Sequence, residues 1–196
     1  MKRRFEARKG QTIFSPGQAC PGFVILSEGT IKVSLMGSSG RDVVLYRVHP
    51  GEVCLQTFTC LIEQQAYSAE GVAETDLQGE LVPADNFHER LENDKDFRES
   101  VLNSVAMRFS EYQTLVEDIA LSGFDMRLAK ALLRLVDPDR KVRSSHSSLA
   151  SETASGRASV TRRLAEFAKQ NLIEQQSDGI RILNFEKLEQ IATGNR

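Results

Sequence analysis

The sequence lacks any run of apolar residues that approaches the ~18 needed for a membrane-spanning helix. It also lacks a segment typical of a secretion signal. The basic residues Lys2 to Arg4 are followed by Phe5-Glu6-Ala7, at the point where an apolar stretch would have to begin. We therefore expect a cytoplasmic protein with no membrane partner.

Cysteine is scarce, and motifs of catalysis are missing. The three cysteines are an odd number in a chain of 196 residues and do not indicate a disulfide framework. One chain also falls short of the four thiolates of an iron–sulfur cluster, and no set of four zinc ligands is evident. The sequence has no phosphate-binding loop, no Gly-x-Ser-x-Gly turn and no histidine with an evident nucleophile and carboxylate partner. We expect neither an enzyme nor a metal site.

Charge is distributed unevenly along a chain that is 40% apolar and 27% charged, a composition that allows a buried core. Residues 1–123 contain 12 Lys and Arg against 18 Asp and Glu, a net charge of −6. Residues 124–196 contain 13 against 9, a net charge of +4. Besides chance drift of surface charge, this division indicates two functions, one of which involves a polyanion.

Short segments rich in β-branched residues fill the first part of the chain. Turns made of Gly, Pro and Ser recur roughly every 8–12 residues, which is typical of a β-barrel or β-sandwich. The predicted strands are 13–14, 22–26, 30–35, 42–48, 67–73 and 79–83.

A long helix is predicted next, because no Pro or Gly occurs between the candidate caps Asn93 and Asp94 and the terminating Gly123. Apolar residues recur at spacings of three and four over about 25 residues, or about 38 Å. We expect this stripe to pair with a second copy of the chain. Packing on its own β-domain is the alternative, above all for the first turns. The candidate dimerisation residues are Val105, Phe109, Tyr112, Val116 and Ile119.

The last part of the chain has the element order of a winged helix-turn-helix. Ser155-Gly156 is the expected tight turn between the two helices of this motif, and Asp125 is the expected cap of the helix before them. Asp178-Gly179 is the expected turn of the hairpin that follows. The predicted elements are helices at 126–136, 148–154, 157–170 and 186–192 and a hairpin at 173–183.

The predicted helix 157–170 has an apolar face and a basic face. At about 100° per residue, Val160, Leu164 and Phe167 cluster on one side and are expected to face the core. The other side is typical of a recognition helix, whose first residues contact base edges in the major groove and whose later cations contact phosphate. A solvated basic face without function is the alternative.

Arginine at the start of such a helix can form two hydrogen bonds to guanine, which makes Arg157 and Arg162 the main candidates for base contacts. Arg163 points toward a flank and is expected to hold a phosphate or an acidic neighbour. The candidate DNA-binding residues are Ser147, Ser148, Arg157, Ala158, Ser159, Arg162, Arg163, Lys169 and Arg181.

In order and spacing, the segments 10–17, 23–33, 49–52, 68–73 and 157–164 and the long helix resemble the CRP/FNR superfamily of bacterial transcription regulators. The resemblance implies an α+β protein in three parts. These are an N-terminal β-roll of the cyclic-nucleotide-binding type (a double-stranded β-helix, or jelly roll) at 1–92 as the sensor domain, a dimerisation helix at 93–122 and a winged helix-turn-helix at 124–196. It also implies a homodimer on an inverted-repeat DNA site, with RNA polymerase as a partner.

The sequence departs from this family where its members bind cyclic nucleotides. Such members carry Gly-Glu for the ribose and Arg-Ser for the cyclic phosphate, whereas this chain has Leu55-Gln56 and Tyr67-Ser68. A neutral tyrosine cannot supply the positive fork that pairs with phosphate, so we expect no response to cyclic AMP. Relatives with an iron–sulfur cluster use cysteines near the N-terminus, and none precedes Cys20; no histidine is evidently placed to bind haem. We expect none of these cofactors.

The segment in which members that bind cyclic nucleotides carry these two pairs, here called the cassette, is a candidate effector region in this chain. Cys54 and Cys60 flank it. In one interpretation they form a disulfide or polysulfide bridge on oxidation. In the other they only fill space in the core. We expect a DNA-binding regulator controlled by an unidentified effector or redox signal. The alternative is a thiol or small-molecule sensor that acts through protein contacts without specific DNA binding. The candidate effector residues are Cys54, Gln56, Thr57, Cys60, Tyr67 and Ser68.

Overall fold

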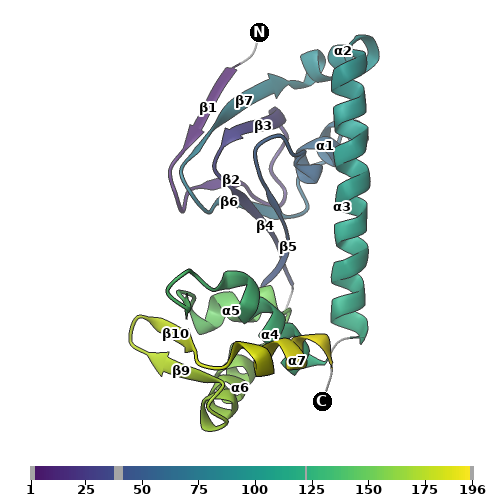
Figure 1. Cartoon of the computed structure of the whole chain (residues 1–196). Coiled ribbons are helices and arrows are strands. Elements are labelled where there is room, and N and C mark those ends of the chain that lie inside the picture. Colours follow the sequence, from purple (N-terminus) through teal and green to yellow (C-terminus); the bar gives the residue numbers. More distant parts are fainter. Residues whose placement is uncertain (1–2, 38–41, 122, 195–196) are drawn as a thin grey trace. The chain divides into compact units, whose positions relative to one another are not determined.

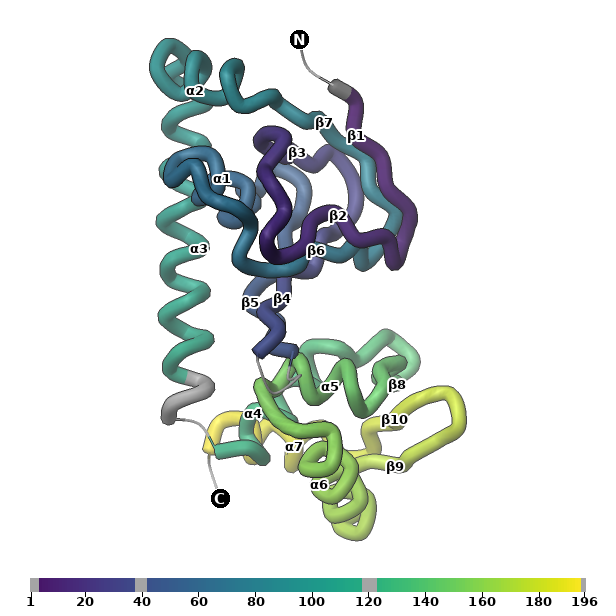
Figure 2. Tube along the Cα trace, turned by 180° about the vertical axis from the view of Figure 1, so that it is seen from behind, coloured from purple at the N-terminus to yellow at the C-terminus, as the bar shows by residue number. Residues whose placement is uncertain are grey.

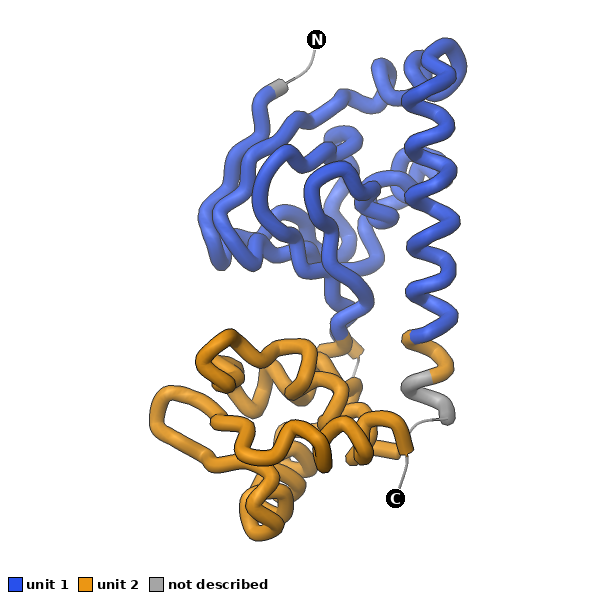
Figure 3. The backbone as a smooth tube through the Cα atoms, viewed as in Figure 1, with its two compact units in different colours: residues 1–36, 44–114 blue, residues 37–43, 115–196 orange. Residues whose placement is uncertain are grey.

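The computed structural model describes residues 3–37, 42–121 and 123–194 (Figure 1). The chain divides into two compact units (Figure 3). The first comprises residues 1–36 and 44–114, and the second comprises residues 37–43 and 115–196.

The first unit is built on two antiparallel sheets. One sheet has the order β1 (Arg3–Ala7), β7 (Leu77–Pro83), β3 (Gly22–Glu28); the other has the order β2 (Thr12–Phe14), β6 (Glu70–Ala73), β4 (Ile31–Met36), β5 (Asp42–Val48). Side chains alternate between buried and less buried along β5, as expected of strands with one face on a core. Phe14, Leu26 and Val33 from the two sheets meet in one buried cluster. This is the predicted jelly-roll architecture.

Three helices complete the first unit: α1 (Leu55–Glu63), α2 (Ala84–Asn93) and α3 (Lys95–Leu121), whose last residues belong to the second unit. Figure 2 shows α1 on the side of the strands where α3 runs. A second buried cluster joins Phe23 of β3, Leu61 of α1, Phe87 of α2 and Val101 of α3. The α3 helix begins where Asp94 Oδ1 accepts a hydrogen bond from Phe97 N–H at 3.0 Å.

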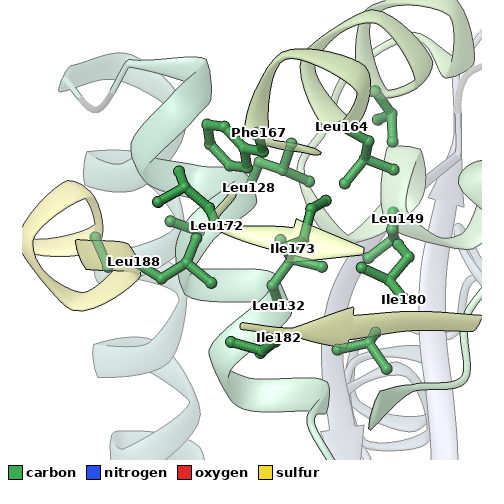
Figure 4. Close-up of a cluster of buried hydrophobic side chains, with 14 of the residues drawn as sticks. Leu128, Leu132, Leu149, Leu164, Phe167, Leu172, Ile173, Ile180, Ile182 and Leu188 are labelled. Atoms are coloured by element: carbon green, nitrogen blue, oxygen red, sulfur yellow. The ribbon is translucent and has the colours of Figure 1, made fainter. Parts of the chain in front are cut away.

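The second unit contains α4 (Phe124–Leu135), β8 (Lys141–Val142), α5 (His146–Glu152), α6 (Arg157–Lys169), β9 (Ile173–Gln176), β10 (Gly179–Ile182) and α7 (Phe185–Thr193). The three strands form an antiparallel sheet in the order β8-β10-β9. Every element of the unit contributes to one apolar core, in which Leu128, Leu132, Leu164, Leu172 and Leu188 are fully buried (Figure 4).

Two details of this unit differ from the sequence expectation. Gly123, not Asp125, is the N-cap residue of α4, and Asp125 lies in the first turn, where a carboxylate favours the positive end of the helix dipole. Gln176 pairs with Gly179, so the two turn residues of the hairpin are Ser177 and Asp178. Gly179 is the first residue of β10 and has a φ of 148°.

Candidate nucleic-acid interface

Helix α6 has the two faces that its sequence predicted. It begins after the N-cap residue Gly156, and Val160, Leu164 and Phe167 are buried in the core of the second unit; Figure 4 shows Leu164 and Phe167 in this core. These three apolar side chains fix the rotation of the helix about its axis. Four of the residues predicted to contact DNA therefore lie exposed on the outer side: Arg157, Ala158, Arg162 and Lys169.

Three positively charged residues lie on the outer side of α6. Arg157, Arg162 and Lys169 are exposed, and they form no ion pair with any residue that the structure describes. Ala158 is exposed beside Arg157, and Ser159 is half-buried. The face therefore offers cationic donors and one small apolar group to a polyanion.

Arg163 belongs to a different environment. Its Nε lies 2.7 Å from Asp125 Oδ1 in the first turn of α4, and a second nitrogen contacts Glu166 one turn further along α6. Of the two roles that the sequence left open, the structure shows the acidic neighbour. Arg163 links α6 to the start of α4.

The turn between α5 and α6 is held by buried hydroxyl groups. Thr153 is 1% exposed, and its Oγ1 donates to Leu149 O at 2.7 Å and lies 2.7 Å from Ser155 Oγ. Ser155 N–H donates to Ala150 O at 2.9 Å, and Ala154 adopts a left-handed conformation with φ of 48°. Because buried polar groups are costly unless they are paired, these bonds hold the angle between the two helices.

The predicted contacts of α5 lie at its beginning. Ser147 is exposed, and Ser148 N–H donates to the N-cap residue Ser145 at 3.0 Å. The sequence analysis missed His146, whose Nδ1 lies 2.9 Å from Thr161 Oγ1 and so joins α5 to α6. No sequence pattern indicated this bond, because it depends on the crossing of the two helices.

The hairpin has a mixed charge. Arg181 is exposed on β10, opposite Glu174 of β9. At the hairpin turn, Lys141 Nζ donates to Asp178 Oδ2 at 2.8 Å, and this hydrogen bond lowers the pKa of Asp178. Only Arg181 among these groups was predicted to contact DNA, and it is the exposed cation of the strand.

The residues of the altered cassette come together in the first unit. Gln56 of α1 accepts hydrogen bonds at its Oε1 from Ser68 N–H at 3.2 Å and from Ser68 Oγ at 3.1 Å. Gln56 N–H donates to Tyr46 Oη at 3.1 Å, and Thr57 is buried with its hydroxyl bonded to Cys54 O. Polar groups of this region are thus paired with one another.

Tyr67 is buried, and its hydroxyl group lies beside a cysteine. Its ring stacks on Phe14 at 4.5 Å between centroids, and its hydroxyl lies 3.2 Å from Cys20 Sγ. Burial first, and then Cys20, raise the pKa of Tyr67. The phenol therefore stays neutral where a phosphate-binding relative would have a guanidinium.

A direct disulfide between Cys54 and Cys60, one of the two bridges that the sequence left open, does not fit this fold. Cys54 is the N-cap residue of α1 and accepts the Phe58 N–H bond, so both cysteines belong to the same helix. Six residues advance a helix by about 9 Å, beyond the ~7 Å limit of Cα separation for a disulfide. All three cysteines are free thiols, and Cys20 packs against the buried cluster that contains Cys54 and Cys60.

Both units match known protein families. Residues 4–94 match the cyclic nucleotide-binding domain family, and residues 126–191 match the Crp-like helix-turn-helix domain family. The transcriptional regulator LdrP of Thermus thermophilus is 29% identical over 200 residues, which cover 97% of this chain and 96% of the relative. The global nitrogen regulator of Synechococcus elongatus is 26% identical over 187 residues, which cover 90% and 83% of the two chains. The chain belongs to the CRP/FNR family of transcription regulators.

Solved structures of CRP/FNR proteins share the fold. A regulator of this family from Eubacterium rectale gives a TM-score of 0.89 at 23% identity, covering 98% of this chain and 90% of the other. A CRP-family regulator from Thermus thermophilus gives 0.79 at 25% identity, covering 97% and 96%. The chain is thus a transcription regulator with a cyclic-nucleotide-binding domain and a helix-turn-helix DNA-binding domain, and its relatives are regulators, not enzymes. None of its helices, within the ranges described, could cross a bilayer.

In this CRP/FNR chain the apolar stripe of α3 divides into two parts. Val101 is buried, Val105 is half-buried, and Tyr112 packs edge-on against Tyr46 of the β-roll at 5.7 Å. Phe109 is 63% exposed and Val116 is 62% exposed. Both alternatives for the stripe therefore apply, each to different residues; Ile119 lies outside the described side chains.

A buried arginine in α3 escaped the sequence analysis. Arg108 is 2% exposed, forms ion pairs with Glu52 and Glu111, and lies with its guanidinium carbon 5.1 Å from the centre of the Tyr46 ring. Its Nε is the one buried side-chain nitrogen or oxygen that has no hydrogen-bond partner among the described residues. Nothing in the local sequence distinguished Arg108 from an exposed arginine, because Glu52 is 56 residues away.

Proposed function

We propose that two copies of this chain bind an inverted-repeat DNA site and that each copy inserts α6 into the major groove. The observation that supports this proposal is the exposed cationic face of α6, whose rotation is fixed by three buried apolar residues. Two such helices spaced by one turn of DNA, about 34 Å, would contact two half-sites of opposite orientation.

Individual residues have separate roles in this proposal. Arg157 and Arg162 each donate two hydrogen bonds to a guanine, and Ala158 contacts a thymine methyl group. Lys169, Ser147, Ser148 and Arg181 contact phosphate or sugar, with Ser159 at the edge of the helix. Arg163 is a positioning residue, because its guanidinium is held by Asp125 and Glu166.

The homodimer would form along α3. Leu102, Phe109 and Val116 are spaced by seven residues and are 57%, 63% and 62% exposed. A heptad repeat of apolar residues that remain exposed in one chain is the pattern by which two helices pair. Val105 and Tyr112, half-buried between the exposed positions, would line the edge of the seam.

The controlling signal would act on the β-roll and would not be cyclic AMP. Tyr67 is neutral and buried, and Gln56 is already bonded to Ser68, so the phosphate and ribose contacts of a cyclic nucleotide have no counterpart. We further propose that the chain acts in the cytoplasm with RNA polymerase as a partner.

Measurement of DNA affinity by fluorescence anisotropy tests the proposal, with a duplex selected from a random pool and with an unrelated duplex. Arg157→Ala is expected to weaken binding to the selected duplex by about 1–3 kcal/mol while changing binding to the unrelated duplex far less. Lys187→Ala is the matched control, because Lys187 is an exposed cation on α7 outside the proposed interface, and it should leave the preference between the two duplexes intact. Equal losses on both duplexes for Arg157→Ala would refute its base contact. An absence of salt-dependent binding to any DNA would refute the proposal in favour of a sensor that acts through protein contacts.

A further inference from the structure

Two thiols from distant parts of the sequence lie side by side in the first unit. Cys20 lies between β2 and β3, and its Sγ is 3.9 Å from Thr57 O in α1. Thr57 and Cys60 are three residues apart and therefore share a face of α1. Cys20 packs against the buried cluster that contains Cys60 and Tyr67, and the nearby Cys20 side chain is one cause of the raised pKa of Cys60. The two sulfur atoms thus belong to one cluster.

Tyr67 completes this cluster with a hydroxyl group. Its Oη is 3.2 Å from Cys20 Sγ, and the stacking of its ring on Phe14 keeps it there. Because burial and Cys20 raise the pKa of Tyr67, the phenol retains its proton and can donate it to the sulfur.

The two thiols differ in access. Cys20 is half-buried, whereas Cys60 is buried and donates to Gln65 O at 2.7 Å. Burial first, and then Cys20, raise the pKa of Cys60 to about 12. Cys20 is therefore the thiol that an oxidant from solution would reach, and Cys60 is the protonated thiol that lies beside it.

We propose that Cys20 and Cys60 form a redox pair that a hydroperoxide converts into an intramolecular disulfide. The Cys20 sulfur attacks the outer oxygen of the hydroperoxide, the O–O bond breaks, and an alcohol (or water) leaves while Cys20 becomes a sulfenic acid. The Cys60 sulfur then attacks the Cys20 sulfur; the S–S bond forms, and the hydroxyl group leaves with the thiol proton as water. The two thiols lose two electrons in total, and the hydroperoxide gains them.

The disulfide would act on the packing beneath α3. It would tie the segment between β2 and β3 to α1, whose Phe58 and Leu61 share a buried cluster with Val101 and Val105 of α3. A constraint on α1 therefore changes the surface on which α3 rests. Disulfide formation itself is independent of DNA binding, whereas its regulatory effect rests on the proposed function.

Peptide mapping tests the chemistry. The full-length reduced chain is treated with hydrogen peroxide, its remaining thiols are alkylated, and it is digested with trypsin without reduction. The tryptic peptide with Cys60 also contains Cys54, because no Lys or Arg lies between Arg47 and Arg90. The Cys54→Ser variant is therefore examined beside the wild type. We expect a Cys20–Cys60 linked peptide that has lost two hydrogen atoms in both proteins, and its absence in Cys20→Ser and Cys60→Ser. A linkage through Cys54, or alkylated Cys20 after treatment, would overturn the proposal.

DNA affinity tests the regulatory effect on the same samples. We expect oxidation to change the affinity of the wild type and of Cys54→Ser by at least about fivefold, reversibly with dithiothreitol. Cys20→Ser and Cys60→Ser should bind as the reduced wild type does, with or without peroxide. A linked peptide with unchanged affinity would overturn the regulation. If the reduced wild type binds no DNA, the proposed function fails while the mapped disulfide stands.

Discussion

Truncation of Phe109 to alanine is expected to weaken self-association of the chain. A phenylalanine side chain offers about 200 Å² of surface, of which 63% is exposed here. Burial of about 125 Å² at about 25 cal/mol per Å² gives about 3 kcal/mol, or about 6 kcal/mol for the two copies in a symmetric dimer. Association realises only part of this amount, so we expect the dissociation constant to rise at least about 100-fold.

Sedimentation equilibrium over a range of protein concentrations measures this change. Met107→Ala is the matched control, because Met107 is 43% exposed but lies about 200° of helix rotation before Phe109. The control should associate as the wild type does. The reasoning would be refuted if Phe109→Ala kept the wild-type dissociation constant, or if Met107→Ala weakened association more.

Two further predictions concern ion pairs. Glu52→Gln is expected to lower the free energy of unfolding by about 3 kcal/mol, because it leaves the buried Arg108 guanidinium with one of its two carboxylates. Urea unfolding followed by circular dichroism measures this, and a loss below about 1 kcal/mol would count against a buried role. Asp178 has a pKa lowered by its hydrogen bond from Lys141, so its stabilising effect is present above the unfolded carboxyl pKa and is lost as pH falls through the folded value. Asp178→Asn should therefore lose less thermal stability than the wild type between about pH 5 and about pH 2; identical slopes would contradict this.

The parts of the fold that could be predicted are those in which the sequence pattern of a single helix or strand shows which of its residues are buried. The buried face of α6 follows from a period of about 3.6 residues, and Val160, Leu164 and Phe167 are all buried. The strands β3, β4 and β5 were located because each is a short run rich in β-branched and apolar residues between turns, and along β5 the buried positions alternate.

The parts that could not be predicted depend on contacts between distant segments. β1 (Arg3–Ala7) is rich in charged residues and becomes a strand because it pairs with β7 along an edge. α1 (Leu55–Glu63) contains two threonines, which favour strands, and it is a helix because of its packing in the first unit. The burial of Arg108 requires Glu52, and the proximity of Cys20 to Cys60 requires the path of the chain between them.

The stripe of α3 shows the same limit within one helix. A spacing of three and four marks residues that share a face, but it does not say which neighbour covers that face. Tyr112 meets Tyr46 of the same chain, whereas Phe109 meets no such partner among the described residues and is 63% exposed. Only the folded chain distinguishes these two positions.

Base substitution in the DNA tests most directly whether α6 contacts the major groove through Arg157. In the selected duplex, 7-deazaguanine replaces each guanine in turn and removes the N7 acceptor without changing Watson–Crick pairing. The account predicts one guanine in each half-site whose replacement weakens wild-type binding by about 1–3 kcal/mol and has no further effect on Arg157→Ala. If every replacement affects the wild type and Arg157→Ala equally, Arg157 makes no contact with guanine N7 and the central claim is contradicted.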